Sequence, residues 1–186
     1  MEEEKLEPTT INVKKEILQW GFSIGVAIIL ALTLKTYVFA SADVDGTSML
    51  PTLVNNDKIL VEKVSVMTHS LKRGEIIIFD SRNENHDIFV KRVIGVEGDR
   101  ILLKDGKVYL NGNLLNEPYL KDNTYTNPGP VLQNNKELTV QKNCVFVMGD
   151  NRSVSYDSRF IGQVNIKYIK GHVIFRTYPF TEMNGF

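Results

Sequence analysis

An uncharged apolar stretch near the N-terminus, residues 17–34 (ILQWGFSIGVAIILALTL), constrains this chain more than any other feature of its sequence. At about 1.5 Å per helical residue, and together with the apolar residues after Lys35, it is long enough to cross a hydrocarbon layer about 30 Å thick. Trp20 and Tyr37 lie near its ends, where amphipathic aromatic side chains anchor helices at a membrane surface. The stretch therefore predicts a transmembrane anchor over residues 17–40.

Two other interpretations of this stretch remain open. A helix that is apolar on all faces also occurs in the core of a soluble protein. A cleavable signal peptide is the second interpretation, because Ala40-Ser41-Ala42 matches the small-residue cleavage pattern. The apolar region of a signal peptide is usually only about 7 to 15 residues long, however, and here a lysine precedes the pattern. We therefore expect the segment to be retained.

The charges beside the anchor predict its orientation. Lys14 and Lys15 stand directly before it, and basic residues are enriched on the cytoplasmic side of membrane spans. We expect a cytoplasmic head of residues 1–16, a single-pass anchor in the plasma membrane and lipid bilayer, and a domain on the outer face over residues 41–186. The lone Cys144 suits an oxidising exterior because it leaves no pair to misbridge.

Composition excludes several classes of protein. The 22 basic and 22 acidic residues balance, which removes the global positive field that nucleic-acid binders use to gather phosphates. A hydrophobic content of 42% is too high for a disordered chain. Cys144 and the three histidines, His69, His86 and His172, show no metal-ligand spacing. We therefore expect no nucleic acid, no metal and no cofactor.

Beyond Ser41 the sequence changes to short apolar runs separated by turn residues, which predicts an all-β domain. Asp105-Gly106 and Asn111-Gly112 predict hairpins, because these residues tolerate the positive φ angles of type I′ turns. Residues 103–142 are more polar and contain Asn127-Pro128-Gly129-Pro130, so we interpret them as a small insertion. Eight strands are expected, at residues 58–64, 75–79, 88–94, 100–103, 107–110, 113–115, 145–148 and 172–178.

Two stretches carry candidate catalytic groups. In residues 46–53 (GTSMLPTL), Ser48 stands in a tight loop that can present its hydroxyl and backbone N–H to a substrate carbonyl, although such a pattern is usually a plain turn. In residues 87–95, strand periodicity places Phe89, Lys91 and Val93 on one face. Apolar neighbours would desolvate Lys91 and favour a neutral amine, which can take a proton from a serine hydroxyl. The alternative is a solvent-facing lysine that protects a strand edge from aggregation.

Two further stretches are also informative. Residues 73–79 (RGEIIIF) predict a turn that leads into a strand buried on both faces, which is a structural feature. Residues 148–159 (MGDNRSVSYDSR) concentrate four hydroxyls, two carboxylates and two guanidiniums in one loop. Groups of this kind fix geometry through bidentate ion pairs and hydrogen bonds.

In this order, behind an N-terminal apolar segment, the four stretches resemble the bacterial type I signal peptidases, membrane-bound Ser/Lys endopeptidases that release exported proteins. The motifs SMxPTL, RGEIIIF, KRVIGxxGD and GDNRxxSxDSR are all present, and the resemblance covers residues 20–178. The modest length between Asp99 and Val145 resembles the smaller enzymes of Gram-positive bacteria. The resemblance implies a mostly β fold of two packed antiparallel sheets, also found in self-cleaving repressors, and secretory preproteins as substrates.

Matched residue by residue, the resemblance implies Ser48 as nucleophile and Lys91 as general base. It implies that Ser155 orients the lysine amine, with Asp157 beside it. Supporting ion pairs are implied at Arg92, Asp150 and Arg159. A shallow apolar pocket for the small residues of Ala-x-Ala cleavage sites is implied at Val44, Gly46, Met49, Leu53, Phe89 and Val90.

The resemblance also sets two requirements. Some members carry a serine two residues before the nucleophile, whose hydroxyl helps to form the oxyanion hole, whereas this chain has Gly46. The backbone N–H of Ser48 would therefore need help from another donor. For Lys91 to act near neutral or mildly alkaline pH, its pKa must fall by about two units from roughly 10.4.

Three rival hypotheses have less support. A Ser-His-Asp triad finds no histidine in the motif stretches. A self-cleaving regulator would need an Ala-Gly or Cys-Gly cut site and a DNA-binding head, and neither dipeptide occurs. A non-catalytic, membrane-tethered β module would leave the combination of Ser48 and Lys91 unexplained. Cleavage of a signal-peptide substrate, compared with the Ser48→Ala variant, distinguishes these hypotheses.

Overall fold

The computed structural model describes residues 13–68 and 70–186, so most of the expected cytoplasmic head lies outside the described residues. The chain divides into two compact units, Met1–Tyr37 and Val38–Phe186, which are described separately. The second unit is called the β domain below.

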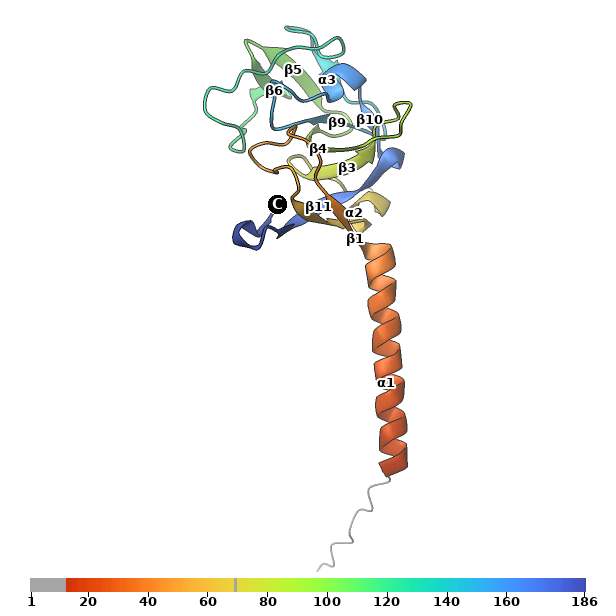
Figure 1. The fold of residues 1–186 in the computed structure, drawn as a ribbon. Coiled ribbons are helices and arrows are strands. Elements are labelled where there is room, and N and C mark those ends of the chain that lie inside the picture. Colours follow the sequence, from red (N-terminus) through yellow and green to blue (C-terminus); the bar gives the residue numbers. More distant parts are fainter. Residues whose placement is uncertain (1–12, 69) are drawn as a thin grey trace, which may run out of the picture. The chain divides into compact units, whose positions relative to one another are not determined.

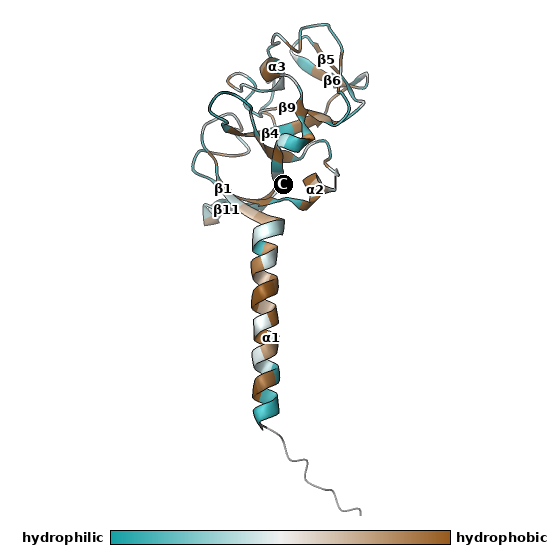
Figure 2. Cartoon of the chain, turned by 90° about the vertical axis from the view of Figure 1, so that its right-hand side faces the viewer, coloured by the Kyte–Doolittle hydropathy of each residue, from teal (hydrophilic) through white to brown (hydrophobic). Residues whose placement is uncertain are grey.

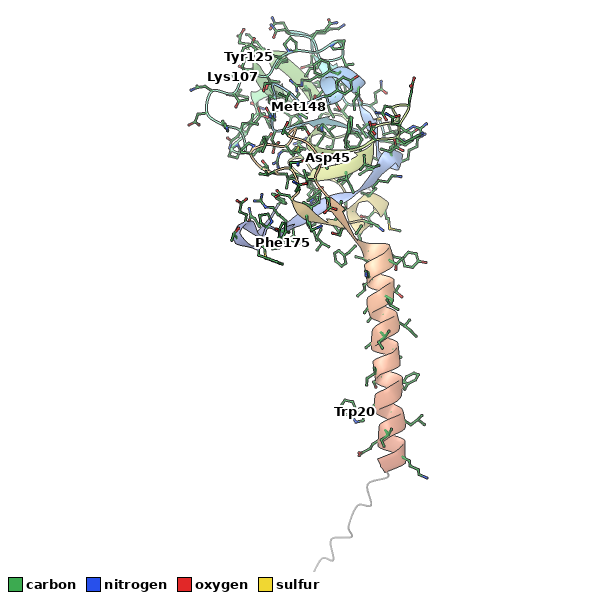
Figure 3. All side chains as sticks on the ribbon, in the orientation of Figure 1. Trp20, Asp45, Lys107, Tyr125, Met148 and Phe175 are labelled. Atoms are coloured by element: carbon green, nitrogen blue, oxygen red, sulfur yellow. The ribbon has the colours of Figure 1, made fainter. Side chains whose placement is uncertain are left out.

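The described part of the N-terminal unit is helix α1 (Val13–Thr33), which continues as a short π-helical segment, η1 (Leu34–Val38), whose last residue belongs to the β domain. The 25 residues Lys14–Val38 are, by length and composition, sufficient to cross a membrane. None of the described side chains of this segment is buried, apart from partial cover at its end, whereas a core helix would bury most of its length. Figure 2 shows the apolar residues along the middle of the helix, and Trp20 points outward in Figure 3.

The helical segment ends two residues before the expected end of the anchor, because Phe39 and Ala40 belong to strand β1 (Phe39–Asp43). Strand β1 pairs along its whole length with β2 (Lys58–Glu62). The N–H of Lys63 donates to the carbonyl of Val38 at 2.9 Å and extends this pairing by one bond. Strand pairing satisfies the backbone N–H and C=O groups of Phe39 and Ala40. The apolar sequence alone would equally allow these two residues to continue the helix.

The β domain contains two antiparallel sheets, so the expected mostly β fold of two packed sheets is confirmed (Figure 1). The larger sheet has the strand order β1-β2-β11-β3-β4-β9-β10, with β12 beside β11. Its further strands are β3 (Ile76–Asp80), β4 (Ile88–Gly95), β9 (Cys144–Met148), β10 (Val164–Asn165), β11 (Ile169–Tyr178) and β12 (Asn184–Gly185). The smaller sheet has the order β7-β6-β5-β8, from β5 (Arg100–Lys104), β6 (Lys107–Leu110), β7 (Asn113–Leu114) and β8 (Leu138–Thr139).

Three apolar clusters hold the β domain together. Strand β3 contributes to two of them, because Ile76 and Ile78 face one side of the larger sheet while Ile77 and Phe79 face the other. The prediction that this strand is buried on both faces is confirmed. The third cluster joins β4 and β9 to β5 and β6, so it packs the smaller sheet against one end of the larger one (Figure 1).

All eight expected strands are present, with shifts of up to three residues at their ends. The two predicted hairpin turns are confirmed, because Asp105-Gly106 and Asn111-Gly112 all have positive φ angles. Val64 was expected in a strand but begins a short helix, α2 (Val64–Met67), where the Glu62 carboxylate accepts its N–H. The sequence did not predict β1, β8, β10, β12 or the short helical segments α3 (Ser158–Ile161), η2 (Ile166–Tyr168) and η3 (Phe180–Glu182).

Candidate active site

Ser48 lies in a turn that follows β1, and local hydrogen bonds fix the path of this turn. The N–H of Val44 donates to the carbonyl of Asp57, and the N–H of Asn56 returns a bond to the carbonyl of Val44, both at 2.8 Å. The N–H of Gly46 donates to Asn55 Oδ1 at 2.8 Å. Gly46 has a φ of 98°, a conformation that disfavours any residue with a Cβ atom. The glycine therefore serves the turn that presents Ser48.

Lys91 lies in the middle of β4 and its side chain meets Ser48. Its Nζ atom donates to Ser48 Oγ at 2.8 Å and to the carbonyl of Val90 at 3.0 Å. The lysine residue is only 4% exposed, so it is not the solvent-facing lysine of the alternative interpretation. The structure therefore brings the predicted nucleophile and the predicted base into direct contact, although 43 residues separate them in sequence.

Burial lowers the pKa of the Lys91 amine to about 8, while the negative charge of Asp157 opposes this change. Removing the ammonium ion from water disfavours its charged form, and this effect is larger than the attraction to the carboxylate. Phe89 acts in both directions: it shields the amine from water, but its ring centre lies 4.9 Å from Nζ, where the ring face attracts a cation. A substantial fraction of the amine is therefore neutral near pH 8.

A cavity of about 540 Å3 adjoins Ser48 and Lys91 and is named the substrate pocket here. Five of the six predicted pocket residues line it, namely Val44, Gly46, Met49, Phe89 and Val90. Leu53 does not line it. One helical turn after Met49, Leu53 is fully buried in the apolar cluster beneath the pocket. The sequence did not predict the other lining residues, which are apolar or aromatic at Ala42, Ile78, Ile88, Val154 and Tyr156 and polar at Asp43, Asp45 and Thr47.

The loop after β9 packs tightly against the nucleophile turn at Gly149. A Cβ atom built at Gly149 would lie 2.2 Å from Ser155 Oγ and 2.4 Å from the carbonyl oxygen of Ser48, so only glycine fits there. Ser155 Oγ is buried and has no hydrogen-bond partner among the described residues. It therefore lies in the loop beside the nucleophile turn but makes no bond to the lysine that it was expected to orient.

Two buried ion pairs fix this loop. Arg159 binds both carboxylate oxygens of Asp157, each at 2.9 Å, and Asp157 also accepts the N–H of Gly149 at 3.0 Å. Arg92 binds both oxygens of Asp150, at 2.9 and 2.7 Å. Both pairs have the bidentate geometry that holds a guanidinium and a carboxylate in one plane.

A third arginine, Arg152, is also buried, at 2% exposed, and the sequence analysis assigned it no role. It donates to the carbonyl of Gly149 at 3.1 Å and to Thr126 Oγ1 at 2.9 Å, and it forms an ion pair with Glu117. The ring of Tyr119 stacks on the guanidinium of Arg92, with Arg92 Cζ 4.0 Å from the ring centre. The region predicted to be an insertion thus supports the loop at Gly149. Glu117 is too far away in sequence for a pattern to have indicated this.

Asn151 also connects the loop with the nucleophile turn. Its backbone N–H donates to the carbonyl of Ser48 at 3.0 Å, and its side-chain amide donates to the carbonyl of Thr47 at 3.1 Å. The backbone N–H of Ser48 itself donates no hydrogen bond to any residue that the structure describes. Within residues 13–68 and 70–186, no group of three or more His, Cys, Asp and Glu side chains is arranged to hold a metal ion.

Comparison with known proteins identifies the family. The family model for signal peptidase, peptidase S26, matches residues 17–178. Signal peptidase IB of Staphylococcus aureus (strain COL) is 36% identical over 181 residues, which cover 91% of this chain and 94% of that protein. Signal peptidase I of Bacillus caldolyticus is 39% identical over 180 residues, 93% of this chain and 97% of that protein.

Among solved structures, a signal peptidase I from Enterococcus faecalis V583 is 31% identical, with a TM-score of 0.45, over 55% of this chain and 95% of that one. The family assignment rests on the sequence matches, which span most of the chain. The chain therefore belongs to the S26 family of signal peptidases and is a serine peptidase.

Proposed function

We propose that this chain is a membrane-anchored endopeptidase that removes signal peptides from exported preproteins by a Ser48/Lys91 dyad. The observation that carries the proposal is the 2.8 Å contact between Ser48 Oγ and a buried lysine whose pKa is lowered to about 8. A buried amine of this kind is a suitable general base for a serine hydroxyl near neutral pH.

An extended substrate segment has a free strand edge to bind. Residues 88–91 of β4 pair with β3 on one side, whereas the pairing of β4 with β9 begins only at Arg92. A peptide added along this edge would place alternate side chains toward the substrate pocket. Val44, Met49 and Val90 form an apolar part of the pocket wall, which complements apolar side chains such as the alanines of Ala-x-Ala.

The reaction then proceeds through two transfers. Neutral Lys91 takes the hydroxyl proton as Ser48 Oγ attacks the scissile carbonyl, and the unpaired N–H of Ser48 is available to the developing oxyanion. The ammonium of Lys91 gives the proton to the departing amine, which leaves an acyl-enzyme. A water molecule, deprotonated by Lys91, hydrolyses the ester and regenerates Ser48. The ion pairs of Asp150 and Asp157 hold the loop that supports this arrangement.

Helix α1 supports membrane anchoring with the β domain on the outer face. Lys14 and Lys15 precede its apolar part, as on the cytoplasmic side of membrane spans. Retention is supported by β1, because Ala40 and Ala42 pack against the apolar core while the strand pairs with β2. A peptidase needs an extended, unpaired segment, so the Ala-Ser-Ala pattern is protected in the folded domain.

Cleavage of a preprotein by the full-length chain in detergent tests the proposed chemistry. We expect Ser48→Ala and Lys91→Ala each to abolish cleavage, and the double variant to be no worse, because the two groups act as one unit. Circular dichroism checks that each variant is folded. A folded Lys91→Ala enzyme with more than about a tenth of the wild-type rate would refute the dyad, because a mere helper leaves that much activity.

External protease treatment of intact cells tests the orientation. The protease should digest the β domain and spare a short N-terminal fragment. Digestion only after lysis would show the opposite orientation. A mature protein that begins at Asp43 would show that the apolar segment is a cleaved signal peptide.

A further inference from the structure

The β domain contains a second cavity, of about 530 Å3. Leu50 and Pro51, from the turn that follows Ser48, form part of its wall. The loop after β9 contributes Asn151 and Ser153, and the insertion contributes Tyr125, which Figure 3 labels near one end of the domain. The mechanism described above does not use this cavity.

The two cavities share no lining residue, but their walls are neighbours along the chain at two places, in the nucleophile turn and between Ser153 and Val154. In the nucleophile turn, the substrate pocket is lined by residues up to Met49, and the lining of the second cavity begins at Leu50. Consecutive Cα atoms are about 3.8 Å apart, so Leu50 lies within about 8 Å of Ser48. Asn151 lines the second cavity and binds the carbonyl of Ser48, which ties its wall to the catalytic turn.

The charge of the second cavity is also defined. Three charged side chains line it among the residues that the structure describes: Asp150, Arg152 and Lys121. Asp150 is neutralised by Arg92 and Arg152 by Glu117. Lys121 is exposed and has no such ion pair, so it gives the cavity a net positive charge.

We infer that the second cavity binds the first residues of the preprotein that follow the scissile bond, and that Lys121 favours an acidic side chain among them. A polypeptide whose small residues fill the substrate pocket must continue past Ser48, and the second cavity begins there. The hydroxyl of Ser153, which donates to Asn151 Oδ1 at 3.0 Å, keeps lone pairs that can accept a backbone N–H of such a segment. This inference rests on the proposed function, because it assigns the part of the substrate that becomes the mature protein.

Matched peptide substrates test the inference with the full-length enzyme in detergent. The peptides share one signal-peptide sequence up to the cut and carry Glu, Gln or Lys at the second position after it. For the wild type we expect kcat/KM to fall from Glu to Gln to Lys, by about two- to five-fold per step, as for an exposed charge pair. Lys121→Glu should reverse this order, and Lys121→Gln should abolish it.

Lys170→Glu is the matched control, because Lys170 is an exposed lysine on β11 that lines neither cavity. It makes the same change in net charge and should leave the preference for Glu intact. Equal cleavage of the three peptides by the wild type would overturn the inference while the proposed function stands. The same reversal in Lys170→Glu would also overturn it, by showing an effect of global charge. Failure of the wild type to cleave any peptide would refute the proposed function itself.

Discussion

The lowered pKa of Lys91 predicts how cleavage depends on pH. Only the neutral amine can accept the Ser48 proton, so kcat/KM should rise with pH and level off above an apparent pKa of about 8. With a pKa of about 8, roughly one amine in eleven is neutral at pH 7, against roughly one in three thousand for an ordinary lysine. Burial therefore increases the active fraction at pH 7 by about 300-fold.

Phe89 provides a perturbation that changes this pKa in a known direction. A carboxylate in place of the ring, in Phe89→Asp, would stabilise the ammonium of Lys91 and raise its pKa by about one unit or more. The rising part of the pH profile should move to higher pH by the same amount. Phe89→Asn is the matched control, because it removes the ring without adding a charge. The rising part of its pH profile should lie at lower pH than that of Phe89→Asp.

The assay is the initial rate of peptide cleavage at low substrate concentration from pH 6 to pH 11, with folding monitored at each pH. A wild-type profile that is already flat by pH 7 would refute the assignment of Lys91 as the titrating base. The assignment would also be refuted if the rising part of the pH profile lay at the same pH in folded Phe89→Asp and folded Phe89→Asn.

Three further predictions concern stability. The Lys91 ammonium has a pKa of about 8 in the folded state and 10.5 in the unfolded state, so it lowers the free energy of unfolding by about 3 kcal/mol below pH 8. This cost disappears as the pH rises to 10.5. Lys91→Met should therefore raise the urea midpoint at pH 7 and lose this advantage near pH 10.5. Glu117→Gln leaves Arg152 buried without its charged partner and should lower the free energy of unfolding by about 3 kcal/mol. Glu137→Gln, in an exposed pair, is the control and should change the free energy of unfolding by less than about 1 kcal/mol. Equal effects of the two substitutions would contradict the role of the buried pair. Gly149→Ala should reduce both cleavage and the melting temperature, because its Cβ would clash with the carbonyl of the nucleophile, and unchanged values of both would disprove that close contact.

Local patterns in the sequence determined much of the fold. The uncharged run after Glu16 specified a long apolar helix, because a helix satisfies its backbone hydrogen bonds within the segment over that length. Strand periodicity placed β3 and β4, and Asp105-Gly106 specified a hairpin, because the chemistry of each lies within a few neighbouring residues. The short strands β8, β10 and β12 have only two residues each, too few for any periodic pattern.

The tertiary structure decided which of these residues meet. Sequence spacing cannot give the 2.8 Å contact between Lys91 and Ser48, because it depends on how the turn after β1 packs beside β4. Leu53 shows the same limit: it belongs to the motif SMxPTL, but it is fully buried in the apolar cluster that also contains Met49 and does not line the pocket, which depends on how the turn packs on the core. The support that Glu117 gives to Arg152 joins segments 35 residues apart, and the tertiary packing of the loop between β7 and β8 against the loop after β9 brings their charges together. Local chemistry is encoded within a few residues, whereas a buried site is assembled by contacts between distant ones.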